Sequence, residues 1–323
     1  MSRAPLAART PWRAVVVLAL GLSALIGMIV LAFVWPAVTA SPRHLPVAVA
    51  APAGRLPAIG DTVDVTVVPD RAAAVSAVER READGAIVVT DGVEVLASPA
   101  SPPAVRSVLD ALAERISSRD GAGAAGPVRV TDVAEPEGDP AALTAASLPL
   151  VLGGIIGGVV VSLRAVGTAR RLAALLGYAC GGGIVVTAIL QPWLGVLAGP
   201  FGLEATAVGL GMLGTASVVV GLTTLLGPRG ILIGAAVTML VANPLAGVTV
   251  PTSFIASPWG TVGQLLVPGA TLTLVRELSL FPRADHSLEW GVLAAWAVLG
   301  FALVVTAGRK GSSIPRRASP TAR

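Results

Sequence analysis

Long apolar stretches alternate with short polar connections along most of the 323 residues. Six stretches each approach the roughly 20 residues with which a helix crosses about 30 Å of hydrocarbon. This pattern predicts a polytopic α-helical membrane protein with six transmembrane helices, and it disfavours a soluble protein with buried core helices. The stretches are Ala14–Trp35, Ala146–Leu163, Leu172–Leu190, Ala205–Leu226, Gly230–Val248 and Leu288–Thr306.

Basic side chains gather in alternate connections between these stretches. Cytoplasmic loops of membrane proteins are enriched in Lys and Arg, so we expect segment 1–13 and a basic, disordered tail at 308–323 to be cytoplasmic. The carboxylates, from Asp61 to Glu289, are expected outside the hydrocarbon. Arginine in place of lysine, with much Ala, Gly and Val, favours a bacterial plasma membrane. The basic residues are Arg3, Arg9, Arg13, Arg164, Arg170, Arg171, Arg229, Arg309, Lys310, Arg316, Arg317 and Arg323.

The first stretch, assigned to residues 14–36, has two interpretations. Val38-Thr39-Ala40 offers small residues at a plausible signal-peptidase site. The apolar region of a secretory signal is only about 7–15 residues long, however, and this run exceeds it. A retained membrane anchor is therefore favoured over a cleaved signal.

Residues 40–145 have the pattern of an extracytoplasmic α/β domain between the first and second spans. Apolar residues alternate over Val63–Val67, and two apolar runs flank Asp91-Gly92, a pair typical of a type I′ hairpin. Ser101 is a candidate N-cap, with Pro102 at the first helical position. The order strand, strand, helix, hairpin, helix, strand predicts a sheet with helices packed on it. The other expected elements are helices Arg71–Ala83 and Ser101–Ser118, hairpin strands Ala86–Thr90 and Val93–Ala97, and a last strand Val128–Val133.

Candidate chemistry in this domain is sparse. It holds 9 basic and 15 acidic residues, so the excess positive charge of the chain belongs to the inner connections, where lipid headgroups rather than nucleic acid explain it. His44 and His286 have no partner at metal or catalytic spacing in the sequence, and Cys180 is the single cysteine. We expect no enzyme activity, no cofactor and no metal site.

Glycines concentrate in the apolar stretches, where small residues let helices approach closely in lipid. They are expected chiefly to pack helices, with a sliding or hinge surface as the less favoured alternative. The candidates are Gly153, Gly154, Gly157, Gly158, Gly177, Gly181, Gly211 and Gly214.

Ionisable groups are nearly absent from the predicted spans. Proton relays and ion-coupled carriers use such groups inside the membrane, so a proton-driven antiporter is disfavoured. No G-x-x-x-x-G-K-[ST] motif occurs, which argues against an ATPase within this chain.

The outer segment 251–287 of the predicted membrane bundle, residues 146–307, is apolar but interrupted by prolines and glycines. Pieces too short to cross lie in the interface or enter the bundle as re-entrant helices. The pair Arg276-Glu277 is then either exposed or an anchor at headgroup level, and the anchor is favoured. The residues of interest here are Asn243, Pro244, Gln264, Pro268, Gly269 and Arg276.

Three stretches carry a family resemblance. They are Glu137-Gly138-Asp139-Pro140 leading into Leu148–Gly154, Asn243–Gly247, and Gly263–Ala270 followed by Leu274-Val275-Arg276. With the layout of one anchor, an outer domain and five clustered spans, the chain resembles type-2 ABC transporter permeases and the YhgE/Pip (phage infection protein) family. The segment before Trp12 is shorter than the amphipathic elbow of such permeases, and the outer domain lacks the coiled-coil insertion of larger members.

The resemblance implies the membrane component of an export system for a hydrophobic or amphipathic compound, acting as a homodimer with a separate ATPase subunit. The alternative is a non-transporting scaffold or surface receptor whose outer domain binds a protein. Membrane lipids are expected partners in both cases, and nucleic acid in neither.

Overall fold

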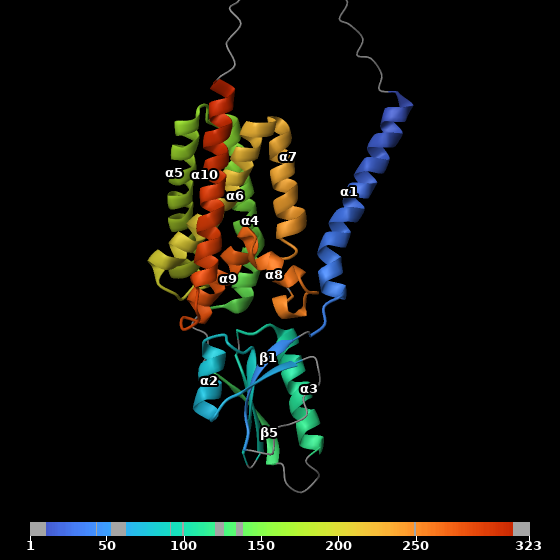
Figure 1. Ribbon diagram of the computed structural model, residues 1–323, viewed down its shortest axis with the longest axis vertical. Coiled ribbons are helices and arrows are strands. Elements are labelled where there is room, and N and C mark those ends of the chain that lie inside the picture. The colour runs from blue at the N-terminus through green and yellow to red at the C-terminus, as the bar shows by residue number, and fades with distance from the viewer. Residues whose placement is uncertain are drawn as a thin grey trace, which may run out of the picture.

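The structure, a computed structural model, describes residues 11–42, 44–52, 63–90, 92–98, 100–119, 126–133, 138–248 and 250–312. A small α/β domain lies at one end of a helical bundle, and a slanted helix, α1 (Trp12–Val38), runs beside the bundle (Figure 1). The first residues of α1 and the last residues of α10 (Ser287–Ser312) lie at the other end, away from the α/β domain (Figure 1).

The domain is built on a five-stranded mixed sheet of order β2-β1-β3-β4-β5. β3 and β4 pair antiparallel as a hairpin, as the sequence predicts, while the other neighbours are parallel. Asp91 lies outside the described residues, so the type of the hairpin turn does too. The strands are β1 (Leu45–Ala50), β2 (Val63–Val67), β3 (Gly85–Val89), β4 (Gly92–Ala97) and β5 (Gly126–Asp132).

One helix covers each face of this sheet. α3 (Pro103–Arg119) packs on the face that carries Leu45, Val47 and Val49, and α2 (Arg71–Glu79) packs on the face that carries Ala48 and Ala50. Alternate residues of a strand point to opposite faces, which divides the core into a large-residue layer and an alanine layer. Each of these two helices begins or ends at a residue other than the one that the sequence predicts.

The expected helix Arg71–Ala83 ends at Glu79 in a turn described below. The expected cap at Ser101 is wrong by one residue, because the Pro102 carbonyl accepts the first helical N–H groups and Pro103 begins the helix.

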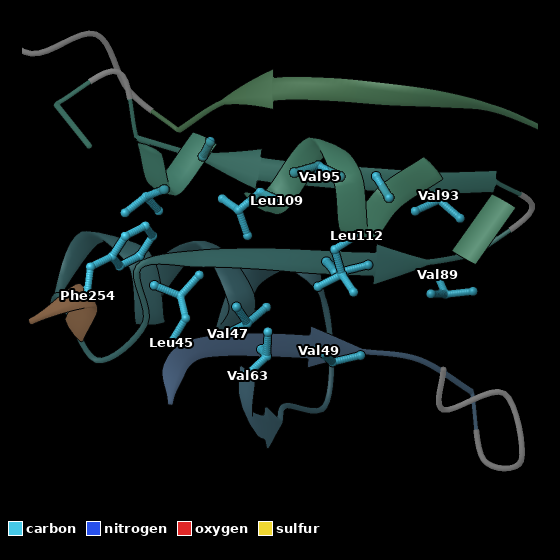
Figure 2. Close-up of a cluster of buried hydrophobic side chains, with 14 residues drawn as sticks. Leu45, Val47, Val49, Val63, Val89, Val93, Val95, Leu109, Leu112 and Phe254 are labelled. Carbon is cyan, nitrogen blue, oxygen red and sulfur yellow. The ribbon is translucent and has the colours of Figure 1, made fainter. Parts of the chain in front are cut away.

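The core of the α/β domain contains one residue from the distant segment before α8. Phe254, in the 3-10 turn η3 (Thr252–Phe254), is only 5% exposed and lies at the end of the layer beside Leu45 (Figure 2). Ser41 N–H donates to the Phe254 carbonyl at 3.3 Å, which adds a backbone link at the same place. The domain is therefore packed onto the bundle side and not only tethered to it.

Helix α6 (Phe201–Leu226) forms the centre of the bundle. It packs against α4 (Pro140–Arg164), α5 (Thr168–Ala188), α7 (Pro228–Val237), α9 (Val267–Leu280) and α10. In the most apolar part of α6, 72% of the residues are buried, whereas in the most apolar part of α1 none is buried within this chain. α6 is therefore the helix around which the others assemble, and α1 offers its apolar surface to lipid or another chain.

Among the residues that the structure describes, five helices are long and apolar enough to cross a membrane: those containing Trp12–Pro36, Pro140–Arg164, Thr168–Trp193, Phe201–Leu226 and Ser287–Arg309. The sixth expected span, Gly230–Val248, is shorter than predicted. The helix observed here begins at Pro228 and consists of the ten residues of α7 and the five of the π-helix η2 (Thr238–Ala242), followed by a turn at Asn243. At 1.5 Å per residue this helix is about 22 Å long, less than the about 30 Å of a hydrocarbon core.

Two further expectations are corrected at the helix ends. α5 continues through the π-helix η1 (Ile189–Trp193), and α10 extends to Ser312, so the first part of the tail expected to be disordered is helical. Residues 313–323 lie outside the described residues.

Candidate functional site

A polar cavity lies at the junction between the α/β domain and the bundle. It encloses about 230 Å³ and is lined by the turn after α2, the start of α3, the segment before η3, the end of α8 (Trp259–Gln264), α9 and the first turn of α10. Five ionisable side chains face this junction chamber, namely Arg81, Asp84, Arg276, Glu277 and Glu289. The sequence does not indicate that these five side chains lie together, so their convergence is a finding of the tertiary structure.

The backbone after α2 places Arg81 in the chamber. The N–H of Glu82 donates to the Ala77 carbonyl and the N–H of Arg81 to the Val78 carbonyl, the pattern of a Schellman motif. The residue in the left-handed conformation is Arg81, with φ 55°, where such motifs usually have glycine. A non-glycine residue there costs on the order of 1 kcal/mol, so the turn keeps an arginine at the expense of local strain.

The Arg81 side chain links the two parts of the protein. Its guanidinium donates to Glu277 Oε1 at 2.8 Å and lies 5.2 Å from the centre of the Phe281 ring. Glu277 is 7% exposed, and its other oxygen, Oε2, lies 3.3 Å from His286 Nδ1. The exposed alternative for the pair Arg276-Glu277 is therefore wrong for Glu277, and His286 has a partner that lies nine residues away in the sequence.

Burial changes the acidity of the groups around the chamber. It raises the pKa of Glu277, and the positive charge of Arg81 offsets part of this rise. Burial also raises the pKa of Asp84, and the positive charge of Arg81 again offsets part of this rise. Burial lowers the pKa of Arg276 to about 10, so this guanidinium remains a cation at neutral pH.

Arg276 and Glu289 lack partners within the chamber. No hydrogen bond or ion pair joins Arg276 to another described residue. Glu289 is 8% exposed and its Oε2 is buried without a hydrogen-bond partner. An uncompensated charge is costly to bury, which makes these two groups candidates for contact with a ligand.

A further buried carboxylate lies at the start of α6, away from the residues that line the junction chamber. Glu204, in the first turn of α6, is 0% exposed, and its Oε1 accepts from Gly199 N–H at 2.9 Å. Its Oε2 is buried without a partner, as are Gln191 Oε1 and Thr187 Oγ1. A buried ionisable group therefore lies one residue before the predicted span Ala205–Leu226.

Apolar hollows lie in the bundle, and two of them are lined in part by α9. One of about 200 Å³ lies between α4 and α5, a small one of about 10 Å³ lies between α4, α6 and α9, and one of about 90 Å³ lies between α6, α7 and α9. The first two share Leu150 and Met212, and the last two share Thr215, Val267 and Pro268. They therefore lie next to one another across the bundle, with these shared side chains forming the walls between them.

Most of the candidate packing glycines lie at helix contacts. A Cβ on Gly154 would lie 2.8 Å from Thr215 Cβ of α6, and one on Gly158 would lie 2.8 Å from Val219 Cβ of α6. A Cβ on Gly157 would overlap the Tyr178 ring of α5, and one on Gly153 would lie 3.7 Å from the Tyr178 hydroxyl oxygen.

The remaining candidate glycines divide into two groups. Gly211 and Gly214 face Thr271 and Val267 of α9. Gly177 and Gly181 have no neighbouring atom within 4 Å of a Cβ position, so their assignment to helix packing is wrong: they lie on an outward face of α5.

The outer segment packs tightly at the α8–α9 junction. A Cβ on Gly269 would overlap the Gly263 carbonyl, and Pro268 is buried in the first turn of α9. Gln264 donates to the Ala246 carbonyl at 3.3 Å and accepts from Thr273 at 2.6 Å, which fixes α8 against the turn at Asn243-Pro244. This segment forms the wall of the chamber on the bundle side.

His44 has a partner as well, at Asp64 Oδ1, 3.0 Å from Nδ1, but both side chains are largely exposed. Within the described ranges no three His, Cys, Asp or Glu residues are grouped so that they could hold a metal ion.

Sequence reasoning identified Arg276 but missed Arg81, Asp84, Glu277 and Glu289 as a group. A local signal existed at Arg81, because a helix ending without glycine or asparagine at its left-handed position is unusual. Nothing local links that turn to α9. No protein-family model, curated protein or solved structure matches the chain.

Proposed function

We propose that the chain is the membrane component of an export system that moves a hydrophobic or amphipathic compound outward. The observation that carries the proposal is the group of neighbouring apolar hollows in the bundle, which begins between α4 and α5 and ends beside α7. The two larger hollows, of about 200 Å³ and about 90 Å³, can accommodate apolar groups, and the junction chamber can accommodate a polar end. No catalytic step is assigned to the chain.

The proposed topology follows the basic connections and the position of the α/β domain. The domain lies outside a bacterial plasma membrane, both termini are cytoplasmic, and the helix Pro228–Ala242 with its following turn completes the sixth passage. The segment 251–287 then enters the outer half of the bundle as a re-entrant element, which is tolerated where protein satisfies the backbone.

Two partners are part of the proposal. A separate ATPase subunit would supply energy, because the sequence has no phosphate-binding loop of the Walker type. A homodimer would cover α1, whose large apolar side chains such as Leu20, Ile26 and Leu31 are each more than 60% exposed. Membrane lipids would cover the remaining surface.

The test compares export by cells with and without the gene, across a panel of lipophilic compounds. Gly211→Leu should impair export, because the new side chain would occupy the contact with Thr271 and push α9 from α6. Gly181→Leu, on the outward face of α5, is the matched control and should leave export intact. Unchanged export or sensitivity in the deletion strain would overturn the proposal.

A scaffold or receptor is the second candidate, and the edge of the sheet favours it. β2 pairs with β1, and Val65 and Val67 on it are 40% and 57% exposed. An exposed edge strand can pair with a strand of a partner. If the chain is a transporter, the Val67→Lys variant should leave export intact. If this variant alone fails to restore the phenotype of the deletion strain, the receptor is favoured.

A further inference from the structure

The junction chamber combines one cation and one anion that do not pair with each other. Arg276, on α9, and Glu289, in the first turn of α10, both line it, yet no ion pair within 4 Å joins them. Arg81 and Glu277 pair with each other at 2.8 Å, and the charge of Glu277 acts on Arg276 without a hydrogen bond or ion pair between them. The two unpaired charges are therefore held apart across the same small cavity.

The cost of this arrangement indicates a ligand. Glu289 is more than nine-tenths buried, and its Oε2 has no hydrogen-bond partner among the described residues. A buried carboxylate without a partner loses its hydration and gains nothing in return. A molecule that places an anionic group beside Arg276 and a cationic group beside Glu289 would give both charges a partner.

The chemistry of the two side chains specifies the ends of that molecule. A guanidinium binds phosphate or carboxylate through two parallel N–H donors, which makes Arg276 the anion site. A carboxylate accepts hydrogen bonds from an ammonium, which makes Glu289 the cation site, with Asp84 as a further acidic group on the opposite wall.

Size and surroundings limit the occupant. A cavity of about 230 Å³ is below the about 300–1,000 Å³ typical of drug-sized ligands, so it fits a headgroup rather than a whole amphipathic molecule. Leu288 also lines the chamber and is 56% exposed, which leaves an apolar surface beside it for an attached chain.

We infer that the junction chamber binds a zwitterionic group, with a phosphate or carboxylate at Arg276 and a primary ammonium at Glu289. The inference rests on the proposed function, because it names the polar end of the amphipathic compound. The zwitterion can come from a lipid headgroup or from a free soluble compound, and the two sources share this chemistry.

The test measures binding to the full-length protein in detergent by native mass spectrometry. The probes are dioctanoyl phosphatidylethanolamine, which carries both charges, dioctanoyl phosphatidylglycerol, which carries the anion only, and soluble phosphoethanolamine. The zwitterionic lipid should bind about tenfold or more tightly than the anionic lipid, as expected for one charged hydrogen bond. Tight binding of phosphoethanolamine supports a free compound, and binding of the lipid alone supports a headgroup.

Variants assign the binding to the chamber. Arg276→Gln and Glu289→Gln should each weaken binding of the zwitterionic lipid by about tenfold, and Arg276→Lys should retain part of it. Arg170→Gln and Glu114→Gln, on exposed surfaces away from the chamber, are the matched controls and should bind as the wild type does. Size-exclusion profiles and unfolding midpoints show whether each variant is folded.

Equal binding of the zwitterionic and anionic lipids, or folded Arg276→Gln and Glu289→Gln proteins that bind like the wild type, would overturn the inference. Either result together with intact export leaves the proposed function standing. Charge-dependent binding in a protein whose deletion changes no export supports the chamber and overturns the exporter.

Discussion

Arg81 and Glu277 lie 196 residues apart in the sequence and form an ion pair of 2.8 Å between the α/β domain and α9. The Glu277 side chain is 9% exposed and the Arg81 side chain is 30% exposed. The carboxylate is therefore shielded from solvent, whereas the guanidinium remains partly accessible to it. We expect it to fix the domain on the bundle.

A double-mutant cycle on this pair should show strong coupling. Arg81→Gly relieves the left-handed backbone while removing the guanidinium, and Glu277→Gln removes the charge while keeping the shape. The coupling energy should be about 1–3 kcal/mol, measured by denaturant unfolding in detergent. The exposed pair Arg80–Glu82, at 3.4 Å, is the control and should give less than about 1 kcal/mol. Equal coupling for the two pairs would show that the buried pair does not hold the domain.

Asp84 should make stability depend on pH. Burial raises its pKa, so the folded protein binds this proton more tightly than the unfolded chain. The resulting stability is present below the unfolded pKa of about 4 and is lost as pH rises through the higher folded pKa. Asp84→Asn should therefore reduce the fall in unfolding midpoint between about pH 4 and pH 8.

The comparison isolates Asp84 from the other charged groups of the chamber, Arg81, Arg276, Glu277 and Glu289, which stay in place in the variant. Asp110→Asn, exposed on α3, is the control and should keep the wild-type pH profile. If both variants kept that profile, the burial of Asp84 would have no energetic consequence.

Gly157 and Gly177 provide a matched pair for helix packing. A Cβ at Gly157 would overlap the Tyr178 ring, so Gly157→Ala should destabilise the bundle by about 1–3 kcal/mol. Gly177→Ala meets no atom within 4 Å and should be neutral or stabilising by up to about 1 kcal/mol, because alanine favours the helix. Thermal unfolding in detergent measures both, and equal midpoints would contradict a packing role for Gly157.

Phe254 should contribute to the stability of the α/β domain, although it comes from a segment far later in the chain. Phe254→Ala should cost about 3–5 kcal/mol, the usual range for a buried aromatic side chain. Hydrogen exchange should rise in β1 and α3, which surround it (Figure 2). Trp259→Ala, at a side chain that is 45% exposed, is the control and should leave exchange in β1 unchanged. Unaltered exchange in the Phe254 variant would refute the contact.

The proposed orientation can be tested by cysteine labelling in a Cys180→Ala background. Cysteine at Ser107, exposed on α3, should react with an impermeant maleimide in intact cells. Cysteine at Ala169, exposed at the start of α5, should react only after the membrane is permeabilised. The reverse pattern would invert the topology and place the α/β domain in the cytoplasm.

Local sequence patterns were enough to predict much of the fold. The apolar runs around Leu152, Leu213 and Leu293 became long helices, because a continuous apolar segment of about 20 residues satisfies its backbone only as a helix in lipid. The runs on either side of Asp91-Gly92 became the hairpin of β3 and β4, since strand alternation and a turn signal are local properties.

The same patterns could not predict where the short or charged segments would lie. Glu277 and Glu289 look like ordinary surface carboxylates in the sequence, and they become buried only because α9 and α10 meet the turn after α2. Phe254 entered the domain core for the same reason, from a segment with no strand or helix pattern of its own. The length of Pro228–Ala242 was also decided by packing, because composition alone supported a longer span.

The sequence by itself determined that this chain has several membrane-length apolar helices and an α/β unit after the first of them, because periodicity and length act within a single segment. The tertiary structure alone decided the junction chamber, because a charge becomes buried, paired or left without a partner only through contacts between segments far apart in the chain. Arg81, Arg276, Glu277 and Glu289 acquire their common environment in that way, and the proposed zwitterion site depends on it.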